Sequence, residues 1–121
     1  RIQDILLAEF RAGRTGNEIL ASARAACADA DLDATIYTHS IGLHGHGAGM
    51  TIGLWDQQDG VPGAGDHQLH PNTAYSIELM GTSAVPEWNG QQIRFMLEQD
   101  AWFDGSTVGW LDGRQTDLLT I

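Results

Sequence analysis

A histidine- and glycine-rich segment, residues 39–49, is the densest cluster of potential ligands in the sequence. His39, His44 and His46 lie within eight residues, and glycine fills four of the positions from 42 to 49. Imidazole is a common ligand for borderline transition metals, and glycine lets a backbone approach a metal or a substrate closely. The segment therefore indicates a metal or substrate site, although surface loops without a function have the same composition.

Two glutamates interrupt apolar stretches that alternate as β-strands do. Glu78 lies in the stretch 73–80, and Glu98 lies in the stretch 92–102. A buried carboxylate without a partner is costly, so such groups pair or bind a metal. Alternatively, both side chains face solvent, or Arg94, on the same strand face as Glu98, neutralises it. With one histidine from the first segment, the two glutamates form a mixed N/O ligand set that suits Mn, Co, Fe or Zn in a two-metal hydrolytic site.

Helices are expected before these groups. Apolar residues at helical spacing from Ile2 to Phe10 predict a first helix, closed by Gly13. Thr15 and Glu18 fit a capping box, which predicts a second helix over the Ala-rich stretch that ends near residue 30.

Strands are expected in the remainder of the chain. Helices followed by strands predict an α+β fold with an antiparallel sheet. The alternation in the stretch 73–80 places Tyr75, Ile77 and Leu79 on one face of the predicted strand. The predicted elements are a strand over 34–38, a short apolar run over 51–55, a loop over 56–71, strands over 73–80 and 92–102, an Asp-Gly hairpin at 111–114 and a last strand over 115–121.

The order and spacing of these groups resemble one enzyme family. His39-Ser40-Ile41-Gly42, after a tyrosine-containing strand, resembles the His-Gly-Ile-Gly step of the pita-bread metallopeptidases of the creatinase/aminopeptidase family, which includes methionine aminopeptidases, prolidases and aminopeptidase P enzymes. His46 follows at the family's spacing of about seven residues. The stretch 69–78 is similar to the family's Leu-x-Pro-Gly-Met segment, which ends in a glutamate, and 94–98 is similar to its final strand. The helix start at 13–18 also resembles that of the family.

The resemblance implies a fold, a site and an activity. Residues 1–121 would be the C-terminal part of a single pita-bread domain, with helices on a curved, mainly antiparallel sheet and the N-terminal half outside this chain. His39, Glu78 and Glu98 would bind two divalent metal ions (Mn, Co, Zn or Fe), with Glu98 bridging them. Glu78 would also act as general acid/base, and His46 would contact a peptide substrate. The full-length protein would hydrolyse an N-terminal or Xaa-Pro peptide bond.

The sequence also departs from the family pattern. Thr38 replaces the usual Gly, Asn72-Thr73 replaces Gly-Met, and 47–49 replaces Glu-x-Pro. The family's two metal-binding aspartates lie well before the first histidine and have no counterpart here, so this chain alone is expected to be inactive. Two alternatives stay open: a metal-free peptide-binding domain of the same fold, and a creatinase-like amidine hydrolase. A homodimer is compatible with the resemblance.

The composition excludes other classes of function. The chain has 16 acidic and 6 basic residues and a net charge of −10, which disfavours nucleic acid and anionic membranes as partners. No apolar run reaches the ~18 residues of a membrane helix. The single cysteine, Cys27, is expected to be a buried packing residue rather than a nucleophile. Core packing is also the expectation for the four tryptophans, Trp55, Trp88, Trp102 and Trp110.

Overall fold

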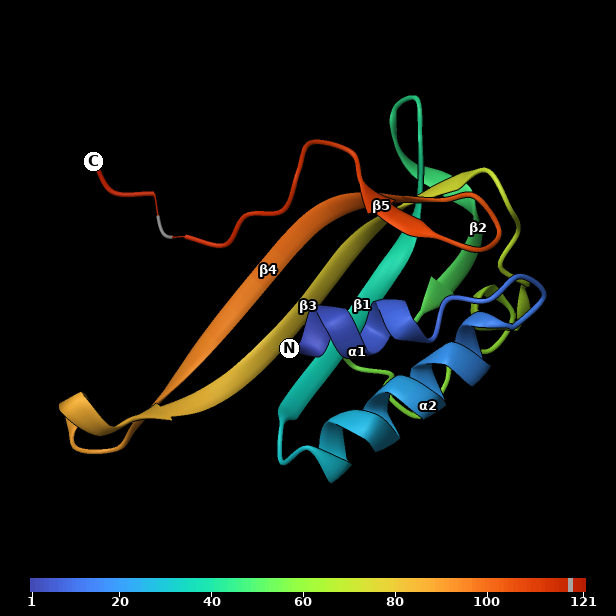
Figure 1. Cartoon of the computed structure of the whole chain (residues 1–121). Coiled ribbons are helices and arrows are strands. Elements are labelled where there is room, and N and C mark those ends of the chain that lie inside the picture. The colour runs from blue at the N-terminus through green and yellow to red at the C-terminus, as the bar shows by residue number, and fades with distance from the viewer. Residues whose placement is uncertain (118) are drawn as a thin grey trace.

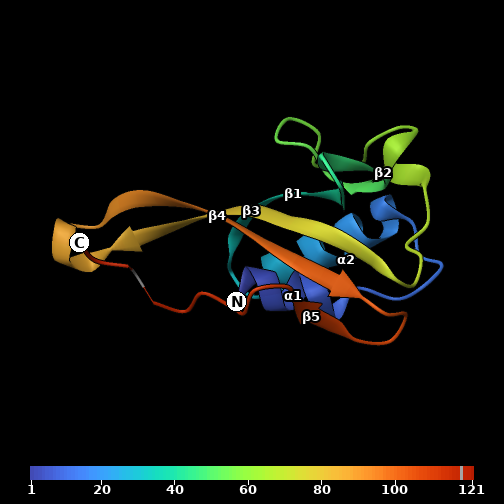
Figure 2. The ribbon, with the colours of Figure 1, turned by 90° about the horizontal axis from the view of Figure 1, so that it is seen from above.

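The computed structural model describes residues 1–117 and 119–121, which form two α-helices and one five-stranded sheet. The sheet is curled and antiparallel, with strand order β2-β1-β3-β4-β5 (Figures 1 and 2). The α+β class predicted from the order of the elements is confirmed. The elements are α1 (Ile2–Ala8), α2 (Gly16–Asp29), β1 (Asp33–Gly42), β2 (Gly45–Ile52), the 3-10 turn η1 (Ala64–Asp66), β3 (Thr73–Val85), the 3-10 turn η2 (Pro86–Trp88), β4 (Gln91–Phe103) and β5 (Val108–Trp110).

The longer helix begins where the sequence predicts. Thr15 Oγ1 accepts a hydrogen bond from the Glu18 backbone N–H at 3.2 Å, and the Glu18 carboxylate accepts one from the Thr15 N–H at 2.7 Å, so the capping box is confirmed. The next residue must be glycine, Gly16, because a Cβ atom at this position would lie 2.1 Å from the carbonyl oxygen of Thr51. The shorter helix, α1, ends earlier than predicted, and Gly13 instead lies in the connecting turn with φ 87°.

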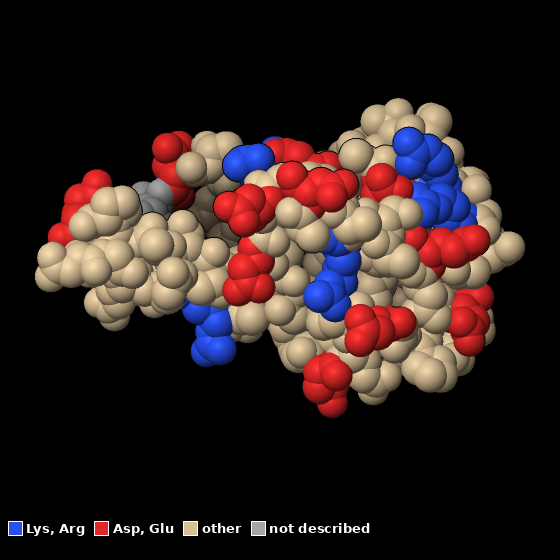
Figure 3. Space-filling model, turned by 90° about the horizontal axis from the view of Figure 1, so that it is seen from below, with Lys and Arg blue, Asp and Glu red and all other residues tan. Residues whose placement is uncertain are grey.

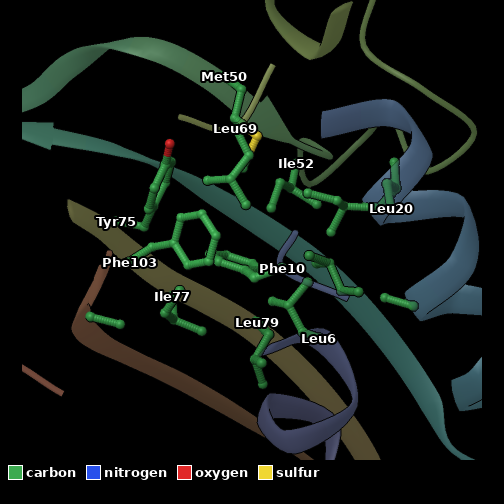
Figure 4. Packing of buried hydrophobic residues seen from close by; sticks show 14 residues of the cluster. Leu6, Phe10, Leu20, Met50, Ile52, Leu69, Tyr75, Ile77, Leu79 and Phe103 are labelled. Carbon is green, nitrogen blue, oxygen red and sulfur yellow. The ribbon is translucent and has the colours of Figure 1, made fainter. Parts of the chain in front are cut away.

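The hydrophobic core lies between the helices and one face of the sheet (Figure 4). Phe10 packs edge-on against Tyr75 and Phe103, with ring centroids 5.6 and 6.1 Å away. Cys27 is buried, as predicted, and burial raises the pKa of its thiol. The side chains that β3 contributes to the core are the predicted alternate residues Tyr75, Ile77 and Leu79. This alternation places Glu78 on the opposite face of the sheet.

The histidine-rich segment forms a β-hairpin, whereas the sequence predicted a strand that stopped at Thr38. An antiparallel hairpin requires paired backbone groups rather than apolar side chains, so this polar segment forms one without an alternating pattern. The register between β1 and β2 shifts between His39 and Ile41. As a result, the stretch 47–50 of β2 lies opposite Ser40 alone, which is a β-bulge.

Strands β3 and β4 are both present as predicted, and both are longer than predicted. Their outer halves extend beyond the helices as a two-stranded ribbon (Figures 1 and 2). The ribbon turns through η2 and two left-handed residues, Asn89 with φ 53° and Gly90 with φ 75°. Phe95, Met96 and Leu97 are 52%, 57% and 51% exposed, because no helix covers this part of β4.

The predicted hairpin at 111–114 and the predicted last strand over 115–121 are wrong. The turn after β4 comes earlier, and the short strand β5 follows it. Asp104 fixes this turn by accepting hydrogen bonds from the backbone N–H groups of Ser106 and Thr107 at 2.8 and 2.7 Å, which also lower the pKa of its carboxyl.

The segment after β5 is extended and is attached to α1 by a side chain. Arg114 donates to Asp4 Oδ1 at 2.6 Å, and its guanidinium lies 5.6 Å from the ring centroid of Trp110. The residues described here, 111–117 and 119–121, form no strand. Leu118, which belongs to the predicted last strand, lies outside the described residues.

Acidic side chains are scattered in separate groups over the face shown in Figure 3, among mostly uncharged residues. Several arginines already contact carboxylates, in the pairs Arg14–Glu9, Arg24–Asp59 and Arg114–Asp4. The expectation that nucleic acids and anionic membranes do not bind stays a prediction. Neither α-helix in the described part of the chain has the length and apolar character needed to cross a bilayer.

Candidate functional site

His39 is the buried member of the candidate site. It lies on β1, on the face of the sheet opposite the core, and is 7% exposed. Its Nδ1 is 3.0 Å from the carbonyl oxygen of Ser40, which can only accept, so Nδ1 carries a proton. In the neutral ring, Nε2 then carries the lone pair. Histidines that bind metals have this arrangement, in which the other ring N–H donates to a carbonyl or carboxylate.

Glu78 lies directly against that second nitrogen. Its Oε1 is 2.8 Å from His39 Nε2, and its side chain is 17% exposed. A lone pair and a carboxylate oxygen at this distance require a proton or another cation between them. The alternation of β3 and the pairing of β1 with β3 bring these two side chains together, as the sequence predicted.

Glu98 lies on β4 directly opposite Glu78 in the sheet. Its Oε1 accepts a hydrogen bond from Ser76 Oγ at 2.8 Å. The backbone of Arg94 pairs with that of Thr82, further out on the ribbon. The side chain of Arg94 makes no ion pair within the described residues. The sequence-based alternative in which Arg94 neutralises Glu98 is therefore not observed, and two carboxylates face each other without a basic side chain between them.

His46 joins the cluster from β2. Its ring stacks on that of His39, with centroids 3.9 Å apart and an interplanar angle of 15°. Its Nε2 is 3.2 Å from the hydroxyl oxygen of Tyr37. The structure therefore places His46 beside His39, and its contact with a substrate stays a prediction.

Tyr37 is a member of the cluster for which the sequence analysis predicted no function. It lies opposite Glu78 in the sheet and two residues before His39, so both side chains project from the same face. Burial raises the pKa of the Tyr37 hydroxyl, and the negative charges of Glu78 and Glu98 raise it further. The available signal was the position of Tyr37 in the predicted strand over 34–38, two residues before His39.

Other histidines lie away from this cluster. His44 is exposed in the β1–β2 turn, and His67 and His70 are exposed in the long loop before β3. None of the three contributes a hydrogen-bonding ring nitrogen to the cluster.

The tryptophans correct a prediction. Trp55, Trp88 and Trp102 are substantially exposed, so core packing is wrong for these three, while Trp110 packs against the core. Their strands and loops lie on parts of the sheet that the two helices leave uncovered. The rings of Trp55 and Tyr37 pack edge-to-face, with their centroids 5.6 Å apart.

A shallow cavity adjoins the two carboxylates. It has a volume of about 190 Å³ and is lined by Trp55, Glu78, Met96, Leu97 and Glu98. Apolar side chains therefore form a wall next to charged groups, an arrangement found in sites that bind small molecules or peptide side chains.

The donor atoms suit a divalent transition metal in kind. His39 Nε2 and Glu78 Oε1 already lie together, and Glu98 lies on the adjacent strand. Within the described residues, however, no group of three or more His, Cys, Asp or Glu side chains is arranged to hold a metal ion. The third donor, Glu98, instead accepts from Ser76.

Comparison with protein-family models, curated proteins and solved structures finds no match to this chain.

Proposed function

We propose that this chain supplies part of a dinuclear metallopeptidase site in a pita-bread domain, and that the full-length protein hydrolyses an N-terminal or Xaa-Pro peptide bond. The main support is the contact between His39 Nε2 and Glu78 Oε1, which lie 2.8 Å apart on neighbouring strands. Glu98 lies opposite Glu78, and His46 stacks on His39. These four residues are the ones that the sequence motifs selected, and the curled antiparallel sheet with helices on one face is compatible with such a domain.

The cluster is suited to hold metal ions rather than to form an ordinary ion pair. In the part of the chain that the structure describes, no arginine or lysine neutralises the two glutamates, and their basic neighbour is His39, whose Nε2 lies 2.8 Å from Glu78 Oε1 and would offer its lone pair to a metal once the proton between them is released. In the proposal, His39, Glu78 and Glu98 are ligands of two divalent ions (Mn, Co, Zn or Fe), and the remaining ligands come from outside this chain. When bound, the ions supply Lewis-acid polarisation of a carbonyl and activation of the attacking water.

The residues of this chain have separate roles in the reaction. Water oxygen adds to the scissile carbonyl carbon, the C–N bond breaks, and Glu78 passes a proton from the water to the leaving amine. His46 donates a hydrogen bond to the carbonyl oxygen as negative charge develops on it. The wall formed by Trp55 and Met96 contacts an apolar side chain of the peptide next to the scissile bond.

The test is to compare the full-length protein with its Glu98→Ala variant for bound metal and for hydrolysis of short peptides. We expect Glu98→Ala to lose metal and to lose at least a hundredfold in kcat/KM. Glu87→Ala is the matched control, since Glu87 is an exposed glutamate in η2 at the tip of the ribbon. Equal metal content and equal activity in the wild-type and Glu98→Ala proteins would refute the proposal. Peptide binding without metal or hydrolysis would support the metal-free binding domain instead.

A further inference from the structure

The side chain of Tyr37 links the candidate substrate-binding histidine to the rigid part of the sheet. Its hydroxyl oxygen lies 3.2 Å from His46 Nε2, and its ring is held between the rings of Trp55 and His39, at centroid distances of 5.6 and 5.2 Å. Tyr37 is also paired with Glu78 in the middle of the β1–β3 ladder. The hydroxyl is therefore held in place by paired backbone and by aromatic contacts on two sides.

His46 itself is held much less firmly. It is exposed, it lies next to the β1–β2 turn, and glycines precede and follow it. Stacking on His39 fixes the plane of its ring, but stacking does not determine which ring nitrogen carries the proton. A hydrogen bond to one nitrogen does determine it, because it assigns the donor and acceptor roles of the ring.

We propose that Tyr37 is a positioning residue for His46: its hydroxyl donates to Nε2 and so fixes both the ring orientation and the tautomer with the proton on Nδ1. A phenol O–H is a stronger acid than a neutral imidazole N–H, so the phenol is the donor in this pair. The Nδ1–H of His46 then remains free to donate to the substrate carbonyl. This inference rests on the proposed function for its catalytic consequence, whereas the tautomer is a property of the metal-free protein.

The first measurement is the tautomer of His46, read from ring ¹⁵N shifts and couplings to the carbon-bound ring protons. The full-length protein is labelled on histidine and studied without metal near pH ~8, where imidazole is neutral. His46→Gln assigns the signal among the five histidines of this chain. We expect a protonated Nδ1 in the wild type and a shift toward the tautomer mixture of free imidazole in Tyr37→Phe. A wild-type His46 with its proton on Nε2 overturns the proposal, whether or not the variant folds.

The matched control is Tyr75→Phe, because the chain has two tyrosines and Tyr75 faces the core on the other side of the sheet. This control removes the same hydroxyl group without touching His46. An equal change of the His46 spectrum in both variants overturns the proposal, since the effect would then be a general one on the fold.

The second measurement separates the inference from the proposed function. In the metal-loaded full-length protein, Tyr37→Phe should lower kcat about two- to tenfold, the range expected for one hydrogen bond, and leave KM unchanged. In a His46→Ala background, the same substitution should have no further effect. Hydrolysis that is unaffected by Tyr37→Phe refutes the inference alone. A shifted tautomer in a protein that neither binds metal nor hydrolyses peptides refutes the proposed function and leaves the Tyr37–His46 pair intact.

Discussion

Replacing Glu98 by Gln should make the metal-free protein more stable, although it removes a proposed ligand. Glu78 and Glu98 are direct cross-strand partners, so their Cβ atoms lie about 5 Å apart. Two unit charges at about 5 Å in water would repel by about 0.8 kcal/mol, which is an upper limit here because the proton between Glu78 and His39 offsets part of the charge of Glu78. Glutamine keeps an oxygen that can accept from Ser76, so the main change is the loss of this repulsion.

The assay is urea unfolding at low ionic strength in the presence of a chelator. We expect Glu98→Gln to raise the free energy of unfolding by up to about 0.8 kcal/mol, equivalent to at most roughly 4 °C in Tm. Glu87→Gln, at the tip of the ribbon, removes the same charge without a facing carboxylate and controls for the overall negative charge of the chain. The difference between the two variants should shrink in about 1 M salt. If Glu98→Gln is no more stable than Glu87→Gln, the facing carboxylates are not in the electrostatic conflict described here.

Three further predictions concern the scaffold. Thr15→Ala removes the N-cap of α2 and should lower the free energy of unfolding by about 0.5–2 kcal/mol in the same urea assay. Burial raises the pKa of the Cys27 thiol, so the folded protein should resist alkylation near pH ~8 and react only as it unfolds, which mass spectrometry can follow. The hydrogen bond from Arg114 lowers the pKa of Asp4 below its ordinary value of 3.8. The Arg114–Asp4 pair therefore stabilises the fold above pH 3.8, and this stabilisation is lost as the pH falls through the lowered pKa of Asp4. Asp4→Asn should remove this pH dependence of the free energy of unfolding, as measured by acid titration. The change should be less than ~1 kcal/mol, because Asp4 is exposed.

The sequence predicted the members of the cluster better than it predicted their pairing. The period of two in β3 identified the face on which Glu78 lies, because the core residues on either side of it are apolar. That Glu78 faces Glu98 depends on the register between β3 and β4, and that register follows from pairing along the whole ribbon. The spacing of residues within one strand contains no information on the register between two strands.

Two other features were beyond local patterns for different reasons. The hairpin that carries His46 is built from backbone pairing in a glycine-rich segment without apolar alternation, and its two-residue turn, Leu43-His44, has no Asn-Gly or Asp-Gly pair to mark it. Near the C-terminus, the Asp-Gly pair at 112–113 suggested a turn, but Asp104 closes a turn first by bonding to the backbone, and the chain then pairs as a strand with β4 only over Val108–Trp110.

Because of the bulge opposite Ser40, an insertion or deletion in β2 would move His46 but not the stacked His39. His39 belongs to the stretch of β1 that is paired with β3, whereas His46 lies on the far side of the bulge, beyond residues 47–50. A residue gained or lost within 47–50 would change the placement of His46 while the pairing of His39 with Ser76 stayed the same. In the proposed function, the substrate contact made by His46 can therefore diversify through changes of length in this short stretch, while the pairing that holds the proposed ligand His39 is kept.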